Sequence, residues 1–166
     1  KAGEVKTAAQ ESQSLAREFE ALLGPRDPKT LEARHEALVW LQELNPRAAL
    51  AEMRSLLEDF EAQQGSGDPA TLHFRHHLAE AVGMAGDPRE ASRLFEELAK
   101  SYVSVLGEEH PDSLDMHHEA LHWLGQVDAN QASQGMARLA KSAGALFGVA
   151  DDLTVHYRLH LTGLLA

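Results

Sequence analysis

The sequence predicts an all-α fold, a superhelix of about eight helices arranged as helix-turn-helix repeats. Three observations predict it. Aromatic residues make up only 5% of the 166 residues, which is few for a β-sandwich. A glycine recurs at Gly24, Gly65, Gly107 and Gly148, at intervals of 41, 42 and 41 residues. After each glycine, apolar residues recur at the spacings of 3, 4 and 7 that mark one face of a helix.

Each recurring glycine opens a short segment that ends one helix and begins the next. The first segment reads Gly24-Pro25-Arg26-Asp27-Pro28. Glycine suits a helix C-cap, and proline is tolerated in a turn or in the first helical turn. The sequence therefore predicts a single array over residues 1–166, which divides into a half repeat at 1–23, repeats at 24–64, 65–106 and 107–147, and a half repeat at 148–166.

Every complete repeat contains two helices separated by a turn. In the first repeat, Ala33, Ala37 and Trp40 mark the apolar face of the first helix, and Asn45-Pro46 supplies the turn. First helices are expected at about residues 30–44, 70–85, 113–127 and 153–165. Second helices are expected at about residues 4–23, 47–64, 88–106 and 130–147.

The second repeat carries the most complete motif. It contains Arg75-His76-His77-Leu78-Ala79, Gly86-Asp87-Pro88-Arg89-Glu90-Ala91 and Phe95. This pattern resembles the tetratricopeptide repeat in its longer form of about 42 residues, as in kinesin-light-chain-like arrays and bacterial signalling proteins. The resemblance implies a non-catalytic, cytoplasmic protein- or peptide-binding module that belongs to a larger regulatory or signalling protein.

The resemblance also implies where a ligand binds, because first helices build the concave wall of tetratricopeptide arrays. The expected wall positions are Glu32, His35, Val39, His73, His76, Glu80, Asp115, His118, His122 and His156. Carboxylates flank the histidines in this set. We therefore expect a groove that favours basic or neutral segments and becomes less acidic as the imidazoles protonate.

The charge and composition narrow the range of partners and cofactors. With a net charge of −11, the chain is expected to repel the nucleic acid backbone and anionic membrane surfaces, so neither is an expected partner. The chain has no cysteine and no glycine motif for phosphate binding, and no cofactor is expected. Self-association through exposed apolar repeat ends is expected at Leu161, Leu164 and Leu165.

One local motif offers an alternative function. His118-Glu119-Ala120-Leu121-His122 matches a zinc-peptidase pattern, and Gly125 and Asp128 extend it to a metzincin-like signature. A zinc site or peptidase with His118 and His122 as ligands is therefore one alternative, and a purely architectural spacer is another. A helix that continues past Gly125 would turn Asp128 about 240° away from His122. We therefore expect neither a bound metal nor enzymatic activity.

Two further histidine pairs stand one helical turn apart, His73 with His77 and His156 with His160. Two imidazoles on one helix face bind a metal weakly, because a stable zinc site needs a third or fourth ligand. These residues are therefore interpreted as solvated or second-shell histidines of the groove.

Overall fold

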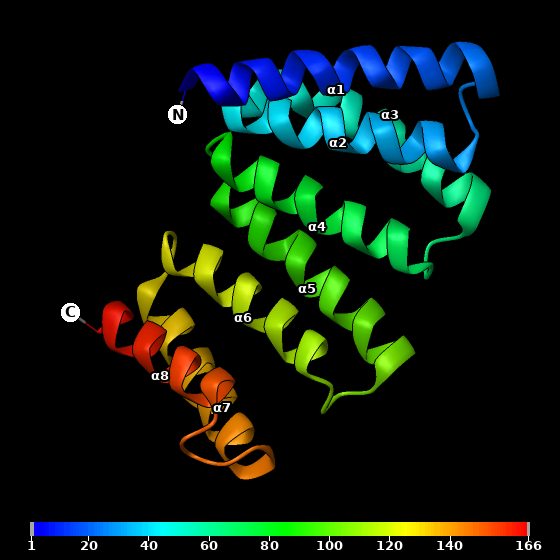
Figure 1. Cartoon of the computed structure of the whole chain (residues 1–166). Coiled ribbons are helices and arrows are strands. Elements are labelled where there is room, and N and C mark those ends of the chain that lie inside the picture. The colour runs from blue at the N-terminus through cyan, green and yellow to red at the C-terminus, as the bar shows by residue number, and fades with distance from the viewer. Residues whose placement is uncertain (1, 166) are drawn as a thin grey trace. The chain divides into compact units, whose positions relative to one another are not determined.

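The computed structural model describes residues 2–165 of the protein and contains all eight expected helices (Figure 1). They are α1 (Ala2–Leu23), α2 (Pro28–Leu44), α3 (Pro46–Gln64), α4 (Pro69–Met84), α5 (Pro88–Leu106), α6 (Pro111–Gly125), α7 (Ala129–Leu146) and α8 (Asp152–Leu164). Within residues 2–165 there is no β-strand, and none of the helices combines the length and apolar character that a membrane crossing requires. The all-α prediction is confirmed, and every predicted helix boundary agrees to within two residues.

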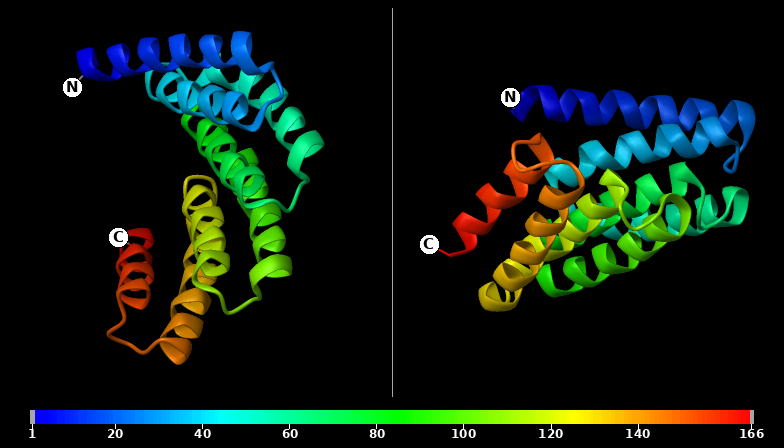
Figure 2. Two further views of the ribbon diagram at one scale, coloured as in Figure 1. Left: turned by 45° about the vertical axis from the view of Figure 1, so that its right-hand side comes forward. Right: turned by 90° about the horizontal axis from the view of Figure 1, so that it is seen from below.

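The chain divides into two compact units, one ending at Ala85 and the other beginning at Gly86. The first unit contains α1 to α4, and the second contains α5 to α8. Within each unit, consecutive helices lie against each other, as α1 and α2 or α7 and α8 do in both views of Figure 2. The two first helices of a unit also touch, α2 with α4 and α6 with α8. Each unit therefore has a surface that two first helices share, while the single array over residues 1–166 stays a prediction.

In each segment between repeats, a glycine ends one helix and a hydrogen-bonded side chain caps the next. Gly24, Gly65, Gly107 and Gly148 have φ angles of 92°, 91°, 97° and 103°, a region that favours glycine. Three residues later in each segment, a side chain accepts a hydrogen bond from a backbone N–H and so caps the next helix. The cap residues are Asp27, Asp68, His110 and Asp151. His110 is therefore a helix cap, a role that its place in a predicted turn did not reveal.

Two glycines let neighbouring helices pack closely in the second unit. A Cβ on Gly135 of α7 would lie 2.3 Å from Cδ2 of Leu121, and one on Gly125 of α6 would lie 2.6 Å from Cδ2 of Leu164. Leu164 and Leu161 pack against the core of this unit and are half-buried. The expected apolar end is therefore smaller than predicted, because only Leu165 of its three leucines is largely exposed, at 69%.

Candidate functional site

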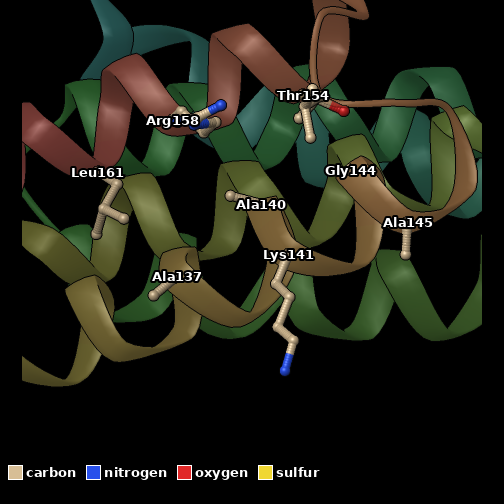
Figure 3. A pocket seen from close by; sticks show the side chains of 9 residues that line it. Ala137, Ala140, Lys141, Gly144, Ala145, Thr154, Arg158 and Leu161 are labelled. Atoms are coloured by element: carbon tan, nitrogen blue, oxygen red, sulfur yellow. The ribbon is translucent and has the colours of Figure 1, made fainter.

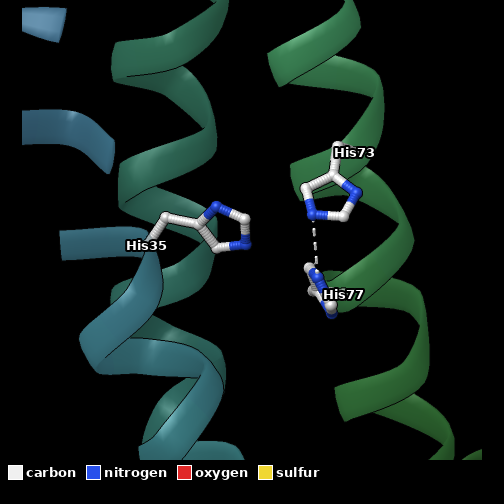
Figure 4. Close-up of side chains that lie close together, drawn as sticks. All are labelled: His35, His73 and His77. Atoms are coloured by element: carbon white, nitrogen blue, oxygen red, sulfur yellow. Dashed lines mark hydrogen bonds between the residues drawn. The ribbon is translucent and has the colours of Figure 1, made fainter. Parts of the chain in front are cut away.

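The first unit brings three histidines of α2 and α4 together. The ring centroid of His35 on α2 lies 5.4 Å from that of His73 and 5.0 Å from that of His77, both on α4. Nε2 of His73 lies 3.2 Å from Nε2 of His77, and the His35 ring points toward both (Figure 4). The structure thus joins the predicted residues His35 and His73 with His77, which was expected to lie in the same groove.

Carboxylates lie on two sides of this cluster. Oε2 of Glu80 lies 3.2 Å from Nδ1 of His77 and 3.7 Å from Nδ1 of His76. Glu32 lines a cavity of about 250 Å³ that His35 and His73 also line. Five of the six expected residues of the first unit therefore surround His77 and this cavity. The sixth, Val39, is half-buried on α2 and does not line the cavity.

Burial lowers the pKa values of two histidines of this cluster, His35 and His73. Burial, followed by the charges of His77 and His73, lowers the pKa of His35 to about 4. Burial is also the largest cause that lowers the pKa of His73, followed by the charge of His77. His35 therefore stays neutral through the ordinary histidine range near pH 6.5, contrary to the expectation that the groove imidazoles protonate there. Nε2 of His35 is buried and has no hydrogen-bond partner among residues 2–165.

The second unit holds a different histidine cluster. Nδ1 of His160 on α8 lies 2.6 Å from Nε2 of His118, and Nε2 of His160 lies 3.1 Å from Nδ1 of His122. The ring centroid of His156 lies 4.8 Å from that of His118. The predicted residues His118, His122 and His156 thus gather near His160, which was also expected to lie in the groove, one helical turn from His156.

The remaining predicted residue, Asp115, lies near the base of this cluster. Burial raises the pKa of the Tyr157 hydroxyl, and the charges of Asp115 and Glu119 raise it further. The Tyr157 ring stacks on that of His118 at a centroid distance of 5.1 Å. Asp115 and Glu119 therefore make the surroundings of the second cluster acidic.

The residues of the peptidase-like motif do not converge on a metal position. His118 is buried. Its two ring nitrogens face Glu119 and His160. Asp128 is the N-cap of α7, where its carboxylate accepts a hydrogen bond from the Gln131 N–H at 2.9 Å. The expectation that the helix continues past Gly125 was wrong, because α6 ends at Gly125, and Asp128 instead caps the next helix.

The same repeat positions carry both histidine clusters. His35 and His118 each follow the preceding glycine by eleven residues, and His73 with His77 match His156 with His160 in the same way. The ring centroids are 4.6 Å apart for the His73 and His77 pair but 6.2 Å apart for the His156 and His160 pair. Between helices the order is reversed: His35 lies 5.4 and 5.0 Å from His73 and His77, whereas His118 lies 4.8 and 4.7 Å from His156 and His160.

A separate cavity of about 530 Å³ lies between α7 and α8 (Figure 3). It is lined by Ala137, Ala140, Lys141, Gly144, Ala145, Val149, Thr154, Arg158 and Leu161. Six of these residues occupy the repeat positions of Gln13, Ala16, Arg17, Glu20, Arg34 and Ala37, which line a cavity of about 240 Å³ in the first unit. There, Glu52 of α3 supplies a further wall. The cavity at α7 and α8 is lined by no third helix within residues 2–165.

Comparisons with known proteins identify the fold. The sequence matches no protein-family model and no curated protein. Two solved structures match at a TM-score of 0.82, each with 18% identity over 98% of this chain and 84% of the other. Both are crystal structures of nearly identical TPR-like repeats in a candidate kinesin light chain of Podosopora anserina, one of them with a single Gln-to-Met substitution. The fold of this chain is therefore that of tetratricopeptide-like (TPR-like) repeats.

Proposed function

We propose that this chain is a non-catalytic module that binds a protein or peptide segment on the surfaces formed by its first helices. One observation carries this proposal, the gathering of imidazoles and carboxylates where α2 meets α4 and where α6 meets α8. Neutral imidazoles both donate and accept hydrogen bonds, while carboxylates accept them, so such a surface suits an extended peptide. The TPR-like fold adds support by analogy only.

The charge of these surfaces determines which segment fits. Glu32 and Glu80 accompany the first histidine cluster, and Asp115 and Glu119 accompany the second. A segment with lysine or arginine would gain from these carboxylates, whereas an acidic segment would be repelled. Because such attraction is screened by ions, binding should weaken as salt rises.

The proposal is tested with two fluorescent peptide pools of equal length, one containing lysine and arginine and one containing aspartate and glutamate. Anisotropy titrations with EDTA present should show tighter binding of the basic pool. For the tightest basic peptide, H76A should lose about 1 kcal/mol for its lost hydrogen bond, roughly a fivefold change in affinity.

The matched control is H110A, which removes a histidine that caps α6 and lies outside both clusters. Circular dichroism establishes that each variant is folded before it is titrated. Equal affinities for H76A and H110A would contradict the proposal. Cross-links from a bound peptide to α3, α5 or α7 alone would contradict it as well.

We also propose that the chain self-associates, with α1 of one copy in the cavity between α7 and α8 of another. In α1, Leu15 stands at the repeat position that Leu56, Leu98 and Leu139 occupy in the other second helices. Those three leucines are buried, whereas Leu15 is 47% exposed. An α1 docked in the cavity would bury Leu15 and would stand where α3 closes the equivalent cavity.

Charge complementarity favours the same arrangement. In the first unit, Nη1 of Arg34 lies 3.2 Å from Oδ2 of Asp59 on α3. Arg158 is the repeat equivalent of Arg34, and Glu18 of α1 is the equivalent of Asp59. Glu18 of one copy would thus meet Arg158 of the other. Sedimentation should show a mass that rises with concentration, and a constant monomer mass would reject this second function.

A further inference from the structure

We propose that His35, His73 and His77 of the first unit form a binding site for a divalent transition-metal ion, with zinc as the best fit. One ring nitrogen from each residue can be chosen so that all three lie within 4.8 Å of one another. Two of the imidazoles come from one face of α4, and the third comes from α2 (Figure 4). The sequence predicts no bound metal, so this proposal differs from that expectation. The site is also distinct from the motif at His118 and His122.

The spacing of the nitrogens is close to that of a tetrahedral site. With zinc-to-nitrogen bonds of about 2.1 Å, two ligand nitrogens lie about 3.4 Å apart. The Nε2 atoms of His73 and His77 are 3.2 Å apart and need little movement to share an ion. His35 supplies the third ligand that an isolated one-turn pair lacks, after its ring moves closer to the pair.

An outer-shell carboxylate already orients one ligand. Oε2 of Glu80 lies 3.2 Å from Nδ1 of His77. If Nδ1 donates its proton to this carboxylate, the lone pair of Nε2 is free to face the His73 nitrogen and the His35 ring. Metal-binding histidines usually have such a partner, which fixes the ring and raises its basicity. Glu80 is therefore a positioning residue of the proposed site.

The surroundings supply both an unsatisfied ligand and a route for the ion. Nε2 of His35 is a buried nitrogen without a hydrogen-bond partner among the described residues, and such a group is costly unless something binds it. The cavity of about 250 Å³ adjoins His35 and His73 and leaves room for water or a carboxylate as a fourth ligand. Glu32 lines this cavity and is a candidate for that fourth ligand. Imidazole donors suit zinc, copper and nickel ions, and they do not suit magnesium or calcium.

The test uses the full chain without a polyhistidine tag and zinc chloride as the only added ligand. Titration calorimetry after EDTA treatment and dialysis should show one tight site per chain. H35A and H77A should each weaken it by more than the roughly 10-fold to 100-fold change typical of losing an outer-shell partner. E80Q should fall within that range, and zinc should raise the Tm of the wild type but not that of H35A.

Two controls make the assignment specific. H156A removes the repeat equivalent of His73 from the second unit, and H76A removes the histidine next to His77. Both variants should keep the tight site. If H35A does not fold, H77N in a folded chain decides the question. The proposal is overturned if the tight site survives H35A or H77N, if H156A or H76A abolishes it, or if zinc binds only weakly and at several sites.

Discussion

The two ring nitrogens of His160 on α8 lie close to those of two histidines of α6, His118 and His122. Burial is the largest cause that lowers the pKa of His160 in the folded protein, followed by the charges of His118, His122 and His156, while Glu119 acts in the opposite direction. In the unfolded chain its pKa returns to the ordinary value of about 6.5. Below that pH the unfolded chain therefore binds more protons at this position than the folded chain does. It follows that stability falls as the pH decreases through about 6.5.

We expect H160Q to reduce this pH dependence. Wild type should lose more unfolding free energy than H160Q when the pH is lowered from about 8 to about 5.5, because only wild type has this imidazole to protonate on unfolding. Urea denaturation at the two pH values measures the difference. Identical losses in the two proteins would show that the buried position of His160 does not affect the stability.

At the residue scale, the sequence revealed the histidines of each cluster but not which of them touch. The one-turn pairs were visible because helix periodicity is a local property. The contact of His35 with the pair on the neighbouring helix was not visible, since repeat equivalence aligned His35 with His76. In the structure the two helices pack with an offset, which places His35 against His73 and His77 instead. Contacts between helices depend on this packing, and the spacing within one helix does not encode it.

At the element scale, the helix boundaries were predictable because each one depends on a few neighbouring residues. A glycine with positive φ, a capping side chain and a proline end one helix and start the next within about five residues. Close packing between helices is less local. Leu121 of α6 occupies space that exists only because residue 135 of α7 has no side chain. Nothing in the sequence near Leu121 or Gly135 indicates that these two residues are in contact.

This contact leads to a prediction about the packing of α6 on α7. Alanine has a higher helix propensity than glycine by about 1 kcal/mol, so G135A alone would favour the helix. Its Cβ would lie 2.3 Å from Cδ2 of Leu121, however, and that side chain must move. G135A should therefore be less favourable in wild type than in an L121A background, with a coupling of about 1 kcal/mol or more.

The double-mutant cycle is measured by urea denaturation of wild type, G135A, L121A and the double variant. Gly144 provides the control, because a Cβ there would lie 3.5 Å from its nearest neighbour, Cγ2 of Thr154. G144A should show no coupling with L121A. A coupling near zero for G135A would mean that Leu121 rotates away without cost.

At the scale of the whole molecule, the proposed contact between copies joins two different surfaces. The surface on α1 contributes Glu18, and the cavity surface on α7 and α8 contributes Arg158. Every contact needs the α1 surface of one chain and the cavity surface of another, whether two copies pair reciprocally or chains add one after another. Because each chain has one surface of each kind, a change to either surface alone should stop growth.

Reversing the charge of Glu18 or Arg158 tests this contact directly. E18R alone would place two positive side chains at the contact, and R158E alone would place two negative ones there, so each variant should stay monomeric at concentrations where wild type assembles. In an equimolar mixture of the two, α1 of E18R is complementary to the cavity of R158E, and α1 of R158E keeps Glu18 for the Arg158 that E18R retains. Both contacts are then complementary, and the mixture should assemble again. A chain with both reversals restores every contact and should assemble again. Sedimentation velocity separates these species, and assembly of the mixture while both single variants stay monomeric would support the pairing of Glu18 with Arg158. If both single variants assemble as wild type does, Glu18 and Arg158 do not meet and the assembly proceeds through another surface.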